Sequence, residues 1–213
     1  MTAFPRAAFL AAAGDPSQFP PEGPPEVAFL GRSNVGKSSA INALAGRRRL
    51  AFASKTPGRT QTANFYDLEG RGRLVDLPGY GYAQAPQAER ARWERLVGAY
   101  LFGRRTLAAL VLLMDARRPL LPSDLELLRW LAPLGVPRLA LLTKADKLTR
   151  AERASALAQA RAQIPDAVLF SSLRRDGVDE ARERLAQWLR DASAAAGNKR
   201  PPAKGKTTGG ETP

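Results

Sequence analysis

Gly31-Arg32-Ser33-Asn34-Val35-Gly36-Lys37-Ser38 decides the fold class, because this stretch satisfies the pattern G-x-x-x-x-G-K-S/T of a phosphate-binding loop. The apolar run Val27–Leu30 before it predicts a buried strand, and residues 39–45 after it predict a helix that ends at Gly46. Phosphate binding requires this order, because a helix N-terminus and inward-pointing backbone N–H groups attract anions. A glycine-rich turn without a ligand is the alternative, and the strand–loop–helix context favours the phosphate site.

The residues of this loop have separate expected roles. Gly31 and Gly36 let the backbone curl, Lys37 reaches the β- and γ-phosphates, and the Ser38 hydroxyl binds Mg²⁺. The residues expected to contact the nucleotide here are Gly31, Arg32, Ser33, Asn34, Val35, Gly36, Lys37 and Ser38.

The composition restricts the chemistry open to the chain. Its 213 residues suit one domain with flanking ends, and 44% hydrophobic residues suffice for a core. The absence of cysteine and histidine excludes disulfides and thiolate metal sites, and removes the usual general base. The expected metal is therefore a hard ion with oxygen ligands, and Mg²⁺ fits.

The chain is strongly basic, with a net charge of +13. The tail after Asp191 contributes +3, so the rest of the chain keeps +10. A body this basic suits a polyanionic partner, and nucleic acid is the first candidate. An arginine-rich proteome, in which Arg replaces Lys everywhere, is the alternative explanation.

The sequence gives no sign of a membrane segment. The longest apolar run, residues 107–114, is too short to span a bilayer. Arg6 followed by the alanine-rich residues 7–13 loosely imitates a signal peptide, but the apolar part has only the minimum length. We expect a cytoplasmic monomer that has no membrane partner.

Strands alternate with helices along the rest of the chain. The expected strands are 61–68 and 73–77 as a hairpin, then 106–115, 136–142 and 167–170. The expected helices are 88–102, one capped by Ser123 with Glu126, one from the cap Thr149 with Glu152 to Gln163, and one from Val178. This alternation predicts an α/β fold with a mostly parallel sheet, helices on both faces and ligand loops at the strands' carboxyl ends.

Three regions follow from this pattern. Residues 1–25 are expected to be an N-terminal edge segment, with a short strand or helix at 4–13, followed by a proline-rich connector without secondary structure. Residues 26–191 form the nucleotide-binding domain. Residues 192–213, rich in Ala, Gly, Lys, Pro and Thr, are expected to be a disordered basic tail.

Two further motifs fall at strand ends. Asp76-Leu77-Pro78-Gly79 places Asp76 to hold Mg²⁺ through water and the Gly79 N–H to sense the γ-phosphate. Thr143-Lys144-Ala145-Asp146 places a carboxylate that can accept two hydrogen bonds from guanine, whereas adenine has no donor there. Asp146 therefore argues for GTP over ATP, and the Lys144 stem can lie over the base. A plain helix N-terminus capped by Asp146 is the alternative.

A third, weaker signal is Phe170-Ser171-Ser172, which follows the last strand. Its backbone N–H groups could contact the O6 side of guanine. The residues of this motif, together with Asp76–Gly79 and Thr143–Asp146, belong to the set of residues expected to bind the nucleotide.

The order and spacing of these motifs are those of a Ras-like GTPase, so the resemblance implies a three-layer P-loop NTPase fold. More closely, the chain resembles the EngB/YihA/YsxC family of bacterial ribosome-associated GTPases. The stretches that carry the resemblance are residues 31–39, Thr56-Pro57-Gly58-Arg59-Thr60-Gln61-Thr62, Asp76-Leu77-Pro78-Gly79-Tyr80-Gly81-Tyr82 and Thr143-Lys144-Ala145-Asp146-Lys147. It covers about residues 7–190, and Thr143, where many GTPases have Asn, is normal in this family.

The resemblance implies GTP binding, slow hydrolysis, a role in late assembly of the large ribosomal subunit, and a cell-division or septation defect on depletion. Ser38 and Thr60 resemble the direct Mg²⁺ ligands, and Asp76 completes the metal set. Lys37, Thr60 and Gly79 are the residues expected to act in hydrolysis. The first switch would comprise Gly58, Arg59, Thr60, Gln61 and Thr62, and the second would begin at Asp76, Leu77, Pro78 and Gly79.

Two positions bear on how the phosphate is cleaved. Many GTPases carry Gln after D-x-x-G, whereas this chain has Tyr80, which predicts a low intrinsic rate that a partner raises. Asn34 stands where GTPases that use K⁺ as an arginine finger often have Asn. K⁺ is therefore a possible second cofactor, and stabilisation of the turn is the alternative role of Asn34.

Arginines near the switches suggest a contact with ribosomal RNA phosphates. These basic clusters are Arg47-Arg48-Arg49 with Lys55, Arg90 with Arg92 and Arg95, Arg117-Arg118, and Arg174-Arg175. A solvated surface is the alternative for the clusters. The alternative for the whole protein is a GTP-dependent structural protein of the division apparatus that does not bind ribosomes.

Overall fold

The computed structural model describes residue 4 and residues 6–52, 62–81 and 87–197. The strands are β1 (Ala8–Ala13), β2 (Glu26–Gly31), β3 (Ala63–Asp67), β4 (Arg73–Asp76), β5 (Leu107–Asp115), β6 (Arg138–Thr143) and β7 (Ala167–Leu169). The α-helices are α1 (Lys37–Ala45), α2 (Gln87–Gly103), α3 (Pro122–Leu131), α4 (Arg150–Gln163) and α5 (Val178–Gly197). Short 3₁₀ helices are η1 (Pro16–Gln18), η2 (Ala132–Leu134) and η3 (Ala145–Lys147).

These strands form one sheet in the order β1-β3-β4-β2-β5-β6-β7. β1 pairs antiparallel with β3, and β3 pairs antiparallel with β4, which is the predicted hairpin. All the remaining pairs are parallel. The mostly parallel α/β sheet predicted from the sequence is therefore confirmed, and β1 supplies its edge strand.

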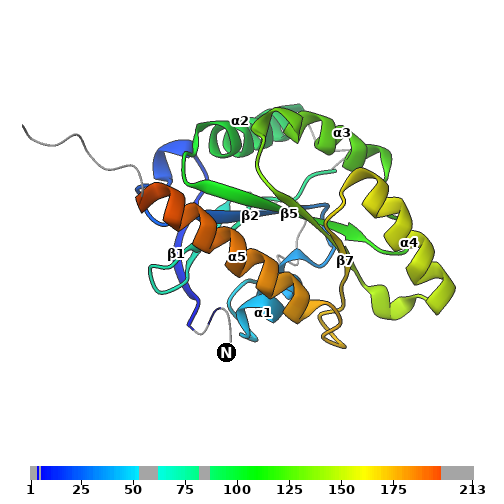
Figure 1. Ribbon diagram of the computed structural model, residues 1–213. Helices are drawn as coiled ribbons and strands as arrows, with labels where there is room; N and C mark the ends of the chain where they lie inside the picture. The colour runs from blue at the N-terminus through cyan, green and yellow to red at the C-terminus, as the bar shows by residue number, and fades with distance from the viewer. Residues whose placement is uncertain (1–3, 5, 53–61, 82–86, 198–213) are drawn as a thin grey trace, which may run out of the picture.

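The central strands are buried on both faces because their side chains alternate between two cores. Along β2, Val27 and Phe29 enter one core, whereas Ala28 and Leu30 enter the other. The first core is covered by α1 and α5, which lie side by side across one face of the sheet (Figure 1). The second core is covered by α2, α3 and α4. Helices on both faces complete the three-layer architecture.

A buried carboxylate fixes the start of β2. Glu26 is fully buried, accepts hydrogen bonds from Tyr100 at 3.0 Å and Arg104 at 2.7 Å, and pairs with Arg73 at 3.1 Å. Such a charge is tolerated in a core only because donors surround it. Arg104 also donates to the Pro20 carbonyl at 2.8 Å, so the same cluster holds the connector against the domain.

The structure corrects three expectations about element ends. The cap Ser123 is wrong: α3 begins at Pro122, where a missing N–H costs nothing, and Asp124 accepts the Leu121 N–H at 2.9 Å. The connector contains η1, which begins after the capping box of Asp15 with Gln18. α5 continues to Gly197, because residues 192–196 are mostly alanine, the strongest helix former.

The predicted start of α4 is confirmed. Thr149 caps α4, and Glu152 completes its capping box as predicted. Among the described residues, no helix combines the length and apolar character needed to cross a bilayer. The rest of the expected tail, residues 198–213, lies outside the described part of the chain.

Candidate nucleotide-binding site

The loop between β2 and α1 forms an anion site from backbone alone. Gly36 has φ +104°, a conformation that favours glycine, and α1 begins directly after it at Lys37. No side chain among the described residues caps this helix. The first N–H groups of α1 are therefore free to bind phosphate oxygens, and the helix dipole adds positive potential.

Close packing fixes the loop against the segment after β4. A Cβ on Gly31 would lie 2.7 Å from Val35 Cγ1, and one on Gly79 would lie 3.2 Å from the Ser33 nitrogen. The Tyr80 N–H donates to the Gly31 carbonyl at 3.3 Å, and the Ser33 N–H donates to the Tyr80 carbonyl at 3.3 Å. The two predicted phosphate motifs are thus adjacent, as their strand-end positions required.

The loop is also tied to the motif after β6. The Thr143 hydroxyl is buried and lies 2.7 Å from the Val35 carbonyl oxygen and 3.1 Å from that of Met114. The Lys144 ammonium donates to the Asn34 carbonyl at 3.1 Å. The Lys144 stem therefore runs from the base-recognition motif to the phosphate loop, which suits a role beside the base.

Asp115, at the end of β5, contacts the expected site through Lys144, although no sequence motif includes it. It accepts from Lys144 at 2.9 Å and from Arg117 at 2.7 Å. The hydrogen bonds from Arg117, and then those from Lys144, hold the pKa of the Asp115 carboxyl well below its usual range. Its position could have indicated this role, because it is a carboxylate at the end of an apolar strand and is paired in register with Thr143.

Asp146, the residue expected to accept hydrogen bonds from guanine, lies in η3, directly after β6. Its Oδ1 accepts from the Ser171 hydroxyl at 2.7 Å, and this bond lowers the pKa of Asp146 below its usual value. The Arg174 N–H in turn donates to the Ser171 oxygen at 3.1 Å. Asp146 is therefore held as a carboxylate, which can accept two N–H donors from guanine. Ser171 acts here through its side chain, a role that the sequence did not predict.

Several residues of the expected nucleotide set have other structural roles. The Phe170 N–H donates to the Leu142 carbonyl at 2.8 Å, and the Ser171 N–H donates to that of Asp176 at 3.0 Å. Of the three backbone N–H groups expected to face guanine O6, those of Phe170 and Ser171 are therefore occupied, which leaves that of Ser172. The apolar side chains of this set that are buried in the protein, and so position the motifs, include those of Val35, Leu77, Ala145 and Phe170.

The residues present suit a magnesium ion. The Lys37 ammonium pairs with the Asp76 carboxylate, which is only 6% exposed. The Ser38 hydroxyl, at the first turn of α1, has no hydrogen-bond partner among the described residues. Mg²⁺ takes one or two protein oxygens and completes its octahedron with phosphates and water, so a hydroxyl and a carboxylate beside a phosphate loop fit it.

Part of the expected site lies outside the described residues. This applies to Gly58, Arg59, Thr60 and Gln61, and so to one predicted Mg²⁺ ligand, and also to Lys55 and Tyr82. Thr62, the last residue of that motif, is described, and its hydroxyl lies 3.2 Å from the Asn64 side-chain oxygen.

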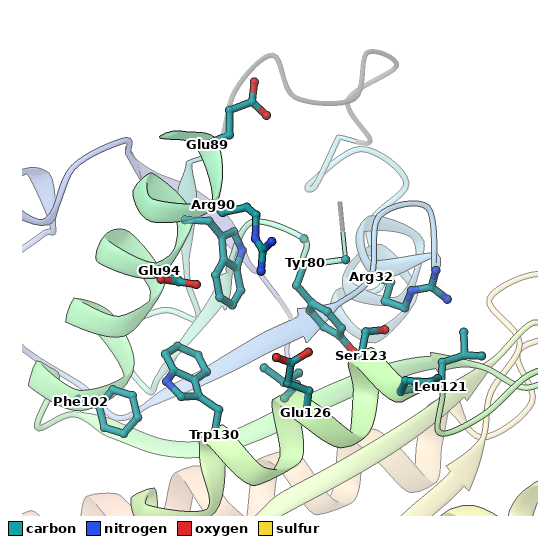
Figure 2. A pocket seen from close by; sticks show the side chains of 15 residues that line it. Arg32, Tyr80, Glu89, Arg90, Glu94, Phe102, Leu121, Ser123, Glu126 and Trp130 are labelled. Atoms are coloured by element: carbon teal, nitrogen blue, oxygen red, sulfur yellow. The ribbon is translucent and has the colours of Figure 1, made fainter. Parts of the chain in front are cut away.

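Tyr80 is turned away from the phosphate loop. Its hydroxyl donates to Asp124 on α3 at 2.7 Å, and only 8% of the residue is exposed. Figure 2 shows the Tyr80 ring pointing toward α3. Burial raises the pKa of Asp124 above its usual value and that of Tyr80 far above its own. The phenol is therefore held by α3, and the position after Gly79 offers no side chain to orient water.

Comparisons with known proteins identify the family of this chain. The model of the family described as 50S ribosome-binding GTPase matches residues 26–144. A relative from Dechloromonas aromatica, named "Probable GTP-binding protein EngB", is 49% identical over 96% of this chain and 97% of its own length. A protein of the same name from Thiobacillus denitrificans is 52% identical over 79% of this chain and 84% of its own length.

Solved structures share the fold. A crystal structure of an EngB protein has a TM-score of 0.63 at 22% identity and covers 78% of this chain and 99% of its own. Era from Aquifex aeolicus, bound to GDP and an aluminium fluoride, has a TM-score of 0.62 at 20% identity and covers 79% of this chain and 57% of its own. With its motifs brought together at the carboxyl ends of the strands, the chain belongs to the EngB family of GTP-binding proteins.

Proposed function

We propose that this protein is a slow GTPase that acts in late assembly of the large ribosomal subunit and is needed for normal cell division. The observation that carries the GTPase part is the double attachment of the phosphate loop. Tyr80 after D-x-x-G and Thr143 of the base-recognition motif each hydrogen-bond it. A change in the loop between the GTP-bound and GDP-bound states can therefore be transmitted to the segments that carry Tyr80 and Thr143. The family description, 50S ribosome-binding GTPase, and the +10 body support the ribosomal part.

The proposed binding mode uses the chain's own charges. Lys37 and the N-terminal N–H groups of α1 bind the β- and γ-phosphates, and Asp146 with Lys144 binds guanine. Mg²⁺, held by Ser38, by Thr60 and through water by Asp76, would neutralise charge on the phosphates. Lys37 then exchanges the Asp76 carboxylate for phosphate oxygens, because both are anionic partners for the same ammonium.

Hydrolysis is proposed to be slow because attack by water needs a group that orients the water. Tyr80 replaces the usual Gln, and its hydroxyl is bonded to Asp124. An activating partner would supply the missing group. Turnover of tens per second by the purified protein would refute this proposal, and single-turnover hydrolysis with and without ribosomal particles measures it.

Asn34 is proposed to bind K⁺ during hydrolysis. Its side chain is exposed and has no partner among the described residues, so its oxygen is free to ligate an ion. Its φ of +61° also suits the alternative role, since Asn tolerates the left-handed conformation in turns. Hydrolysis rates in K⁺ and Na⁺ buffers, with ribosomal particles present, separate the two roles, and equal rates would exclude the ion.

The ribosomal role is tested by sedimentation with ribosomal particles. We expect co-migration with the large subunit in a non-hydrolysable GTP analogue and not in GDP. We also expect replacement of the exposed Arg47–Arg49 by Ala to weaken binding and reduce its salt dependence, because these side chains would contact RNA phosphates. No co-migration in either state would favour the alternative, a GTP-binding protein of the division apparatus.

A further inference from the structure

A groove lies between α2 and α3, beside the segment Gly79–Gly81 (Figure 2). Its volume is about 1010 Å³. Aromatic rings form much of its lining: the Trp93 and Trp130 centroids are 5.7 Å apart, and Phe102 contacts Trp130 edge-on at 5.4 Å. Phe102 is 51% exposed. Accessible aromatic rings gathered in a hollow are typical of a surface that binds a partner.

The charge of the groove is opposite to that of the chain. The chain carries +13, yet this groove is lined by three carboxylates, Glu89, Glu94 and Glu126, against two guanidinium groups. Glu94 from α2 and Glu126 from α3 flank Trp130 (Figure 2). Within the described residues none of these carboxylates forms an ion pair, so their charges are available to a ligand.

We propose that this groove binds a basic, extended segment of a protein partner, with an arginine side chain stacked on Trp130 and paired with Glu94 and Glu126. A guanidinium group suits this place because it stacks on indole rings and also donates to carboxylates. RNA suits it less well, because the carboxylates outnumber the guanidinium groups of Arg32 and Arg90 in the lining and repel phosphates. The groove would therefore contact protein, while the arginines at 47–49 contact RNA.

One hydrogen bond links the groove to the nucleotide site. Trp93 Nε1 donates to the Pro78 carbonyl at 2.9 Å, and Pro78 precedes Gly79, which is proposed to sense the γ-phosphate. A shift of this segment with nucleotide state would move Trp93 and reshape the groove. We therefore expect partner affinity to depend on the bound nucleotide. This coupling rests on the proposed GTP switch, whereas the groove itself does not.

Tryptophan fluorescence tests the groove directly. In full-length protein carrying Trp188→Phe, Trp93 and Trp130 are the remaining tryptophans. A short synthetic peptide rich in arginine and proline should change their emission saturably, and its counterpart with Glu in place of Arg should not. Glu94→Gln with Glu126→Gln should weaken peptide binding about five- to tenfold, because two charge pairs are lost.

The matched control is Glu180→Gln with Glu183→Gln, which removes the same charge from exposed positions on α5, across the sheet. Equal weakening by both double variants, or displacement of the peptide by a short RNA, would overturn the proposal. Titrations in GDP and in a non-hydrolysable GTP analogue test the coupling, and equal affinities would overturn that part alone. GTP binding, measured separately with the same variants, shows whether the nucleotide site itself has failed.

Discussion

The hydroxyl of Thr143 lies 2.7 Å from the carbonyl oxygen of Val35, although 108 residues separate them in the chain. Val35 belongs to the loop expected to bind phosphate, and Thr143 opens the motif expected to bind the base. The bond is fully buried, so it is shielded from competition by water. It therefore fixes the distance between the two halves of the nucleotide site.

Thr143→Val should loosen this connection while preserving side-chain shape. The Val35 carbonyl would lose its buried donor, which we expect to lower the free energy of unfolding by about 1–3 kcal/mol. GTP affinity should fall as well, because the loop and the base motif would no longer be held in register. Urea unfolding and a nucleotide titration measure the two effects. Thr143→Ser keeps the hydroxyl and should retain most of the free energy of unfolding and most of the GTP affinity. An equal loss of GTP affinity in Thr143→Ser and in Thr143→Val would contradict this account.

The sequence predicted the fold well because its strongest signals are local. The alternation of apolar runs with amphipathic stretches predicted the parallel sheet, and the β2–loop–α1 unit was recognisable from its G-x-x-x-x-G-K-S pattern between an apolar run and a helical stretch. Element ends were less predictable, since they depend on competing local bonds. Ser123 can cap a helix, but α3 begins one residue earlier at Pro122, so that Leu121 is the N-cap and Asp124 accepts its N–H from within the first turn.

The sequence predicted side chains that could bind a ligand, but it did not reveal those that bind one another within the candidate site. Asp115 and the hydroxyl of Ser171 escaped notice because their roles arise from contacts with Lys144 and Asp146 on other strand ends. Such contacts require the register of the sheet, which no single motif contains. The groove between α2 and α3 was not predictable for the same reason, because it forms only where these two helices lie together in the fold.

Ser171→Ala should change the pH dependence of nucleotide binding. The Ser171 hydroxyl lowers the pKa of Asp146, so the wild-type carboxylate stays ionised to a lower pH than an ordinary Asp. Guanine requires the ionised form. Removal of the hydroxyl should raise the Asp146 pKa toward the ordinary value of an aspartate, so that GDP affinity begins to fall at a higher pH. Titrations of folded protein at several pH values measure this shift. Identical profiles for wild type and variant would contradict the role given to Ser171.

Asp115→Asn should reduce stability and alter its dependence on pH. The folded-state pKa of Asp115 is below its unfolded value, so its contribution to stability is present above about pH 4 and is lost as the pH falls. The variant should therefore be less stable at neutral pH, and its stability should fall less steeply on acidification. Unfolding by urea at a series of pH values provides the comparison. Glu183→Gln, an exposed change on α5, should leave stability at neutral pH nearly unchanged.

Gly177→Ala tests how the loop that carries Ser171 and Ser172 is held. Gly177 has φ +69°, and a Cβ there would lie 2.2 Å from the Leu169 carbonyl oxygen. The backbone must shift to relieve this contact, which should lower the free energy of unfolding by about 2–4 kcal/mol. Because the shift displaces Ser171 from Asp146, GDP affinity should also fall.

Gly135→Ala is the matched control for this substitution. Gly135 has nearly the same φ, +65°, but a Cβ there would meet no atom within 4 Å. It should therefore show only the strain of the left-handed conformation, about 1 kcal/mol, with unchanged GDP affinity because Gly135 lies after η2 and away from the nucleotide motifs. Thermal unfolding and GDP titration of both variants separate the collision with Leu169 from backbone strain. Equal losses in the two would show that the contact at Gly177 relaxes without cost.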